Sequence, residues 1–106
     1  MTDIAIDQVK LREEILGDGQ DDYFGLYEII WSLNDHYPDI GRDLKIAAAR
    51  AIIRDLLMEG GISLYRTVWA SNHYDSVPSD EALRAIDGPS AWEDPSDDPY
   101  FCYAAA

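Results

Sequence analysis

The sequence contains few basic residues for its size. Only 8 of its 106 residues are Lys or Arg, against 21 Asp and Glu, so the formal net charge is −13 at pH 7. A chain of this charge repels the phosphate backbone of nucleic acids and anionic membrane surfaces, and it attracts basic molecules. We therefore expect no nucleic-acid partner, no membrane partner and no binding of duplex DNA at physiological salt.

Cysteine is also scarce, since Cys102 is the only one. A disulfide within the chain is excluded, which is typical of proteins of the reducing cytoplasm. Cys102 lies in an apolar segment that predicts a strand, so we expect a buried, unreactive thiol. The first 16 residues alternate charged and apolar side chains, a pattern of neither a signal peptide nor a transmembrane helix. These features predict a cytoplasmic protein.

Motifs of catalysis and of cofactor binding are missing. The sequence has no G-x-S-x-G, G-x-G-x-x-G or G-x-x-x-x-G-K-[ST] motif, and His36 and His73 lack the spacing of metal ligands. The acidic run that starts at Asp18 does not fit a calcium loop, because Ile29 stands at its twelfth position, where such loops carry Glu. We therefore predict a non-enzymatic protein with no cofactor and no metal site.

Apolar residues make up 47% of the chain, which is sufficient for one core and a single domain over residues 1–106. Hydrophobic spacing and turn residues divide this domain into an N-terminal helix and loop (1–20), a helical pair (21–60) and a mixed segment (61–106). The predicted helices span residues 4–16, 23–35, 40–58 and 80–86, and the predicted strands span residues 62–69 and 100–104.

This order of elements predicts an α+β, winged-helix-like domain with three N-terminal helices, a short two-stranded sheet and one short helix. The segment Gly17–Asp22 is expected to end the first helix, because it contains two glycines and three acids. Trp31 is expected to be buried between the second and third helices. If so, Trp31→Ala costs about 3–5 kcal/mol of stability.

Charge is distributed unevenly along the chain. Residues 1–39 carry a net charge of −8, residues 40–66 carry +2 and residues 67–106 carry −7. The third predicted helix would be the recognition helix of a winged-helix DNA reader, and its bases are Arg42, Lys45, Arg50 and Arg54. The predicted wing adds only Arg66. The acidic segments on both sides argue against binding to a phosphate backbone.

The segment from Asp87 to Tyr100 is the strongest candidate for a binding site. It contains five acids and no base, and an aromatic anchor beside acids suits the surface of a basic protein. The alternative is that Trp92 and Tyr100 pack in the core while the acids only solvate a loop. A second acidic cluster lies before residue 23. The candidate partner-binding residues are Asp18, Asp21, Asp22, Asp87, Trp92, Glu93, Asp94, Asp97, Asp98 and Tyr100.

Several short motifs carry a resemblance to a known family. They are residues 25–31 (GLYEIIW), Tyr37-Pro38, Leu56-Leu57 with Gly60, Ser79 with Ala82-Leu83, Trp92, and Pro99-Tyr100-Phe101. Over about residues 23–104 the chain resembles the small acidic immunity proteins of bacterial polymorphic toxin systems. The resemblance implies a protein that binds a cognate toxin domain and blocks it, but it identifies neither the toxin nor the contact residues.

Together, the charge and the resemblance predict a stoichiometric inhibitor. Its acidic loops would occlude the basic active-site cleft of a bacterial toxin domain, since a basic cleft attracts acids at long range. Two alternatives remain open at this point. One is a winged-helix transcription regulator, and the other is an acidic nucleic-acid mimic that inhibits a DNA-binding protein.

Overall fold

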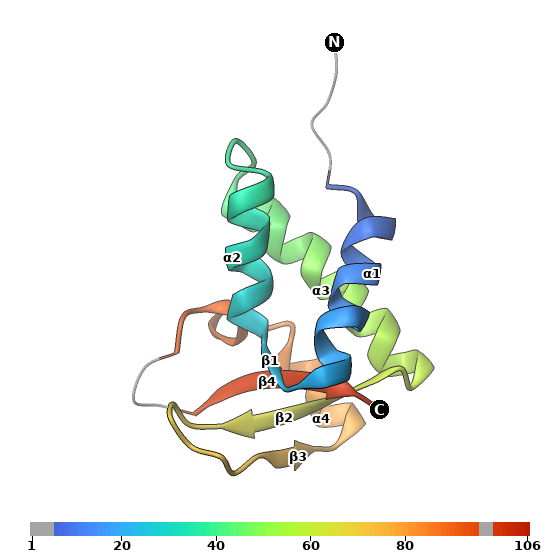
Figure 1. Cartoon of the computed structure of the whole chain (residues 1–106), viewed down its shortest axis with the longest axis vertical. Helices are drawn as coiled ribbons and strands as arrows, with labels where there is room; N and C mark the ends of the chain where they lie inside the picture. Colours follow the sequence, from blue (N-terminus) through green and yellow to red (C-terminus); the bar gives the residue numbers. More distant parts are fainter. Residues whose placement is uncertain (1–5, 96–98) are drawn as a thin grey trace.

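A computed structural model describes residues 6–95 and 99–106 of the chain. Four α-helices, one short 3₁₀ helix and four strands follow one another in these residues (Figure 1). In chain order they are α1 (Gln8–Asp21), β1 (Phe24–Gly25), α2 (Leu26–His36), α3 (Arg42–Glu59), β2 (Ile62–Thr67), β3 (Asp75–Val77), α4 (Ser79–Ala85), η1 (Pro89–Trp92) and β4 (Tyr100–Ala105).

The four strands form one antiparallel sheet in the order β1-β4-β2-β3. The C-terminal strand β4 is therefore internal, and it pairs with β2 from Ile62↔Ala105 to Thr67↔Tyr100. The predicted α+β class and the pairing of these two strands are confirmed. The winged-helix-like outline with a two-stranded sheet is wrong, because β1 and β3 add a strand at each edge. With two and three residues, they are too short to show an alternating pattern in the sequence.

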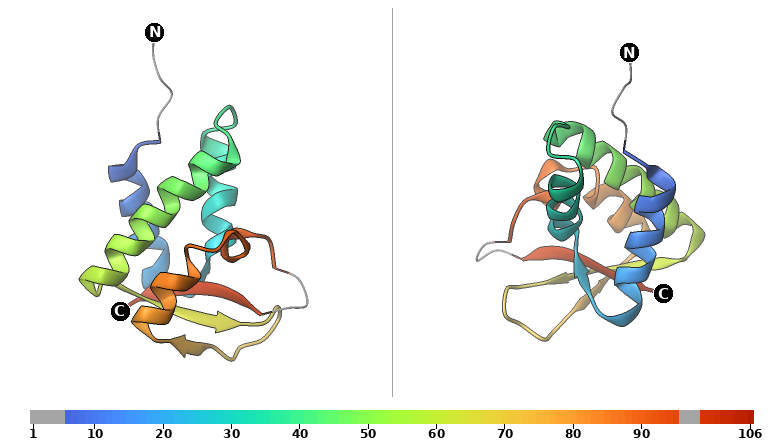
Figure 2. Two further views of the ribbon diagram at one scale, coloured as in Figure 1. Left: turned by 180° about the vertical axis from the view of Figure 1, so that it is seen from behind. Right: turned by 45° about the horizontal axis from the view of Figure 1, so that its top comes forward.

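Helices cover one face of the sheet and leave the other open. In Figure 1 helix α4 lies behind the sheet, and no helix lies in front of β2 and β3. Figure 2, left, shows the same molecule from behind, with α4 in front of the strands and α3 above them. Ile62, Leu64 and Tyr103 are almost fully buried and belong to the core on the covered side. The opposite face is therefore free to carry other side chains.

Helix α1 is longer than the sequence predicts. It continues through Gly17 and Gly19 to Asp21, so the expected break at residues 17–22 is wrong. Gly19 is buried, and a Cβ atom there would lie 2.8 Å from the Tyr103 ring. The Tyr103 hydroxyl donates a hydrogen bond of 2.9 Å to the carbonyl oxygen of Ile15 in the same helix. The glycine therefore allows α1 to approach the sheet closely instead of ending the helix.

The end of α3 agrees with the sequence. Gly60 has φ 78°, the left-handed conformation that glycine adopts without strain, and it terminates the helix. The next N–H, of Gly61, donates to the carbonyl oxygen of Leu56. Within the described residues, no helix has both the length and the apolar character needed to cross a membrane.

Trp31 is half exposed and Trp92 is fully buried. The Trp31 side chain is 48% exposed and not buried between α2 and α3, so the predicted core role of Trp31 is wrong. Its Nε1 donates 2.8 Å to Asp94 Oδ1. Trp92 has no exposed surface, and its Nε1 donates 2.9 Å to the carbonyl oxygen of Ile86. Trp92 is therefore a core residue that fixes η1, the alternative to partner contact that the sequence left open for it.

Candidate functional site

The basic side chains of the protein are largely engaged in contacts within the chain. Four of them form ion pairs, Arg12–Glu59, Arg54–Asp87, Arg66–Glu81 and Arg84–Asp80. Three others donate to neutral groups: Arg42 to the carbonyl of Trp92, Lys45 to the side chain of Asn34, and Arg50 to the carbonyl of Ile86. Among the contacts of the described residues, only the Lys10 side chain has no such partner. Most basic side chains are therefore already engaged within the chain, and four of them have their charge offset by an acid.

The acids between Asp87 and Tyr100 differ in whether a base offsets their charge. Asp87 is paired with Arg54, which offsets its charge. Glu93 and Asp94 follow η1 and are exposed, and Asp94 accepts the hydrogen bond from Trp31. Asp97 and Asp98 lie outside the described residues. In the described part of this loop, Glu93 and Asp94 are thus the acids that no base offsets.

The earlier acidic cluster lies at the C-terminal end of α1. Asp18 is exposed, and its partial desolvation beside Glu14 raises the pKa of its carboxyl group. Asp22 is exposed as well, and its Oδ1 accepts a hydrogen bond of 2.7 Å from the backbone N–H of Tyr23. The backbone of Asp21 ends α1, and its side chain lies outside the described part of the structure. This cluster is therefore followed directly in the chain by Tyr23, which belongs to a group of aromatic rings.

Three tyrosines pack together next to Asp22. The rings of Tyr23 and Tyr74 stack with 3.8 Å between centroids and 5° between planes. Tyr65 meets Tyr23 edge to face at 5.0 Å. Partial burial, together with the charges of nearby groups that include Asp22, raises the pKa of Tyr74. An acid and three aromatic rings are thus brought together from three separate segments of the chain.

A second group of aromatic rings surrounds Tyr100, the last of the predicted site residues. Its ring lies 5.6 Å from that of Tyr27, which in turn lies 4.8 Å from that of Trp31. Desolvation raises the pKa of Tyr100, and among the charges that add to this effect are those of Tyr74 and Glu28.

Strand register places both groups on the same side of the sheet. Residues that face each other across antiparallel strands point to one side, and this side changes with every residue. The pairs Tyr65↔Cys102 and Thr67↔Tyr100 thus share the face opposite to that of Leu64 and Tyr103. The sheet positions of β2 and β4 on this open face are Ser63, Tyr65, Thr67, Tyr100, Cys102 and Ala104.

Tyr27 extends this face over β1. Gly25 pairs with Cys102, and a Cβ atom at Gly25 would lie 2.3 Å from the Tyr27 ring. The ring therefore covers β1 on the open side of the sheet. We call the six residues Tyr23, Tyr27, Trp31, Tyr65, Tyr74 and Tyr100 the aromatic strip. Asp22 and Asp94 lie along it, because they accept hydrogen bonds from the Tyr23 N–H and the Trp31 indole. Glu28 adjoins it, because its Oε2 accepts a hydrogen bond from the N–H of Gly25, which the Tyr27 ring covers.

A small cavity lies at one end of the strip. Its volume is about 260 Å³, and Glu93, Asp94, Tyr100 and Phe101 are among its lining residues. Phe101 points to the other side of β4 from Tyr100, so the cavity reaches around the end of the strand. It combines two carboxylates with two aromatic walls.

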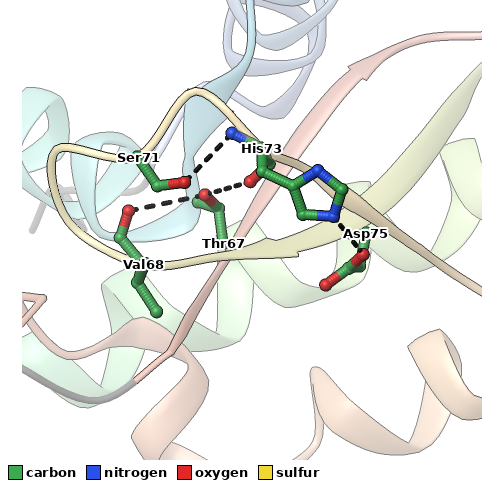
Figure 3. Close-up of polar contacts among 5 residues, drawn as sticks. All are labelled: Thr67, Val68, Ser71, His73 and Asp75. Carbon is green, nitrogen blue, oxygen red and sulfur yellow. Dashed lines mark hydrogen bonds and ion pairs between the residues drawn. The ribbon is translucent and has the colours of Figure 1, made fainter.

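Ser71 and His73 in the β2–β3 connection, with Asp75 at the start of β3, have the residue types of a catalytic triad but not its geometry. His73 Nε2 lies 2.8 Å from Asp75 Oδ1. The Ser71 hydroxyl accepts a hydrogen bond of 3.0 Å from the backbone N–H of His73, and the imidazole ring is turned away from it (Figure 3). The Thr67 hydroxyl donates 2.7 Å to the His73 carbonyl oxygen. Ser71 and Thr67 thus stabilise the turn, and no hydroxyl–imidazole pair is formed here.

Cys102 lies beneath the strip, and the sequence-based prediction of a buried thiol is confirmed. The side chain is 2% exposed. Desolvation, with smaller effects of Glu28 and Asp22, raises the pKa of the thiol to about 12. Burial likewise raises the pKa of the Tyr27 hydroxyl to about 12. Both groups are therefore held in their neutral forms in the folded protein.

This burial makes stability sensitive to alkali. In the unfolded chain a thiol loses its proton near pH 8.5 and a tyrosine near pH 10, so above these values the unfolded state binds fewer protons than the folded state. Stability should be fully present below about pH 8.5 and should fall as the pH rises towards about 12. The midpoint of urea unfolding, measured at intervals of pH, tests this expectation.

Cys102→Ala provides the control for the thiol. The variant should lose the decline between about pH 8.5 and 9.5, where tyrosines in unfolded chains are still protonated, although its stability at neutral pH can be lower. An equal slope for the variant and the natural protein in this interval would contradict a contribution of Cys102.

The aromatic strip was missed by sequence reasoning because its members come from five separate places in the chain. The only sign of it in the sequence was the high aromatic content, since the chain contains seven Tyr and three Trp.

Within the described residues, no group of three or more His, Cys, Asp or Glu side chains is arranged to hold a metal ion. Comparison of the chain with protein-family models, with curated proteins and with solved structures finds no match.

Proposed function

We propose that this protein is a non-enzymatic inhibitor that binds a basic partner protein, in the manner of an immunity protein that occludes the active-site cleft of a toxin domain. The observation that supports this proposal is that most basic side chains already form contacts within the chain. Seven of the eight form contacts within the chain, while exposed acids such as Asp22 and Glu93 have no basic partner among the described contacts. The negative field therefore remains available for an external cation-bearing surface.

Occlusion is the mechanism that this surface supports best. A basic cleft that binds phosphates or nucleotides presents Lys and Arg side chains at close spacing, and acids on a rigid scaffold can occupy the same positions. Aromatic side chains beside the acids supply the buried area that charge alone does not provide. The cytoplasm is the compartment proposed for this interaction, since the single cysteine fits a reducing environment.

The test is co-expression with the C-terminal domain encoded by the adjacent upstream gene. We expect growth of a bacterial host to be arrested by that domain alone and restored by this protein. The purified pair should form a stable complex whose Kd rises with salt concentration. Persistent growth arrest, or the lack of a complex at low salt, would contradict the immunity function.

A further inference from the structure

The open face of the sheet combines aromatic rings with acids. Trp31 and Tyr23 are 48% and 38% exposed, and Tyr65, Tyr74 and Tyr100 are partly exposed. No helix lies in front of β2 and β3 in Figure 1. Large exposed aromatic side chains on one uncovered face mark a surface that another molecule can bury.

We propose that the aromatic strip is the docking surface for an arginine-bearing segment of the basic partner. This inference rests on the proposed function and adds to it the place of binding and the side chain that is recognised. A guanidinium group stacks on aromatic faces and at the same time donates several hydrogen bonds to carboxylates. The strip offers both kinds of contact within one surface.

Acids lie at intervals along the strip. Asp22 adjoins the Tyr23–Tyr74 stack, and Asp94 holds the Trp31 indole. Each of these carboxylates uses one oxygen in the contact described, and an ionised carboxylate accepts about four hydrogen bonds in all. Free acceptor positions therefore remain beside the rings. This arrangement suits arginine better than lysine, because an ammonium group is more strongly hydrated and has no planar face for stacking.

The bases of the protein do not compete for these positions. The β2 and β4 positions on the open face include no Lys or Arg, and Arg66 points to the covered side, where it pairs with Glu81 and lies over the Phe101 ring. A platform of aromatic rings on a sheet can also stack nucleic-acid bases, but such platforms work together with a positively charged groove. Here the charge has the opposite sign, so the surface complements a cationic segment.

The experiment uses fluorescein-labelled nona-arginine and nona-lysine peptides as probes, with fluorescence anisotropy as the readout. The variant is Asp22→Asn/Asp94→Asn. Its amides retain an acceptor oxygen for the Tyr23 N–H and the Trp31 indole, so the fold should be preserved. The control is Asp35→Asn/Asp39→Asn, at the end of α2 and in the loop to α3, the end of the molecule away from the sheet (Figure 1). Both pairs change the net charge equally.

We expect the strip variant to bind nona-arginine about tenfold more weakly than the natural protein, and the control to differ by less than about twofold. Nona-arginine should bind the natural protein about threefold or more tightly than nona-lysine, since only guanidinium stacks on the rings. Trp31→Ala should reduce this preference for arginine, because it removes the most exposed ring of the strip.

The outcomes separate the two proposals. Equal weakening by the strip and control variants would overturn the docking surface and leave the general attraction of basic partners intact. Salt-insensitive or undetectable binding of both peptides would contradict the proposed function itself. Tight binding of a single-stranded oligonucleotide that Trp31→Ala abolishes would assign the strip to nucleic acid and overturn the inference. A dimer of this chain that is detected by sedimentation and dissociated by Trp31→Ala would also overturn the inference.

Discussion

Trp92→Ala is expected to lower the free energy of unfolding by about 3–5 kcal/mol, the range for truncation of a large aromatic side chain in a core. The side chain has no exposed surface, so its removal leaves a cavity that the surrounding core fills only in part. The substitution also removes the indole N–H that satisfies the carbonyl oxygen of Ile86, although Arg50 donates to the same oxygen. Urea unfolding followed by circular dichroism measures the change.

Trp31→Ala is the matched control for this prediction. The same atoms are removed, but the side chain is half exposed, and only the hydrogen bond to Asp94 and the edge contact with Tyr27 are lost. We expect a loss of about 1 kcal/mol, the scale of a single exposed hydrogen bond and aromatic contact. A loss as large as that of Trp92→Ala would mean that Trp31 is packed more tightly than the structure shows.

These two tryptophans show what limits prediction from this sequence. Trp31 follows Tyr27 by four residues on α2, and the two rings contact each other. Spacing does not tell which side of a helix faces the core when apolar and aromatic residues surround most of it, as they do in α2. Trp92 stands among acids and prolines, where no periodicity exists. Its indole N–H donates to Ile86, six residues earlier, and its carbonyl oxygen accepts from Arg42, which is 50 residues earlier.

Elements with clear apolar spacing or clear end signals were predictable, and the two shortest strands were not. The approximate extents of α3 and of strands β2 and β4 follow from apolar spacing and from the Gly60-Gly61 stop. Strand β1 has two residues, and β3 carries polar residues at two of its three positions, so neither produces a local signal. Their pairing is determined by β4 and β2, which offer free backbone groups at their outer edges.

The sequence predicted the acids of the candidate site and one of its rings. Asp22, Asp94 and Tyr100 were expected to contact a partner, and the structure places them along one open face of the sheet. The rings that join them were not foreseen, because stacking of Tyr23 on Tyr74 requires the complete sheet. Tertiary contacts between distant segments, which leave no local pattern, account for this difference.

The loop acids give the second prediction of large effect. If Glu93, Asp94, Asp97 and Asp98 steer a basic partner, their joint replacement by Gln and Asn should slow association about tenfold or more at low salt. We expect the fold to be unaffected, because Glu93 and Asp94 are exposed and contribute little to stability, and because removal of like charges reduces repulsion. The measurement is stopped-flow association with the proposed toxin domain or with fluorescein-labelled nona-arginine.

Salt dependence distinguishes steering from direct contact. Charges are screened over about 10 Å at 0.1 M salt, so the difference between the variant and the natural protein should shrink as salt increases. The control replaces Asp35, Asp39, Asp43 and Asp55 by Asn, which removes four negative charges from the same total of −13 but at the helical side of the molecule. A control that slows association as much as the loop variant would show that net charge alone acts. Equal association rates of the loop variant and the natural protein at low salt would instead exclude steering by this loop, and the cluster at Asp18 and Asp22, at the end of α1, would then be the next acidic surface to test.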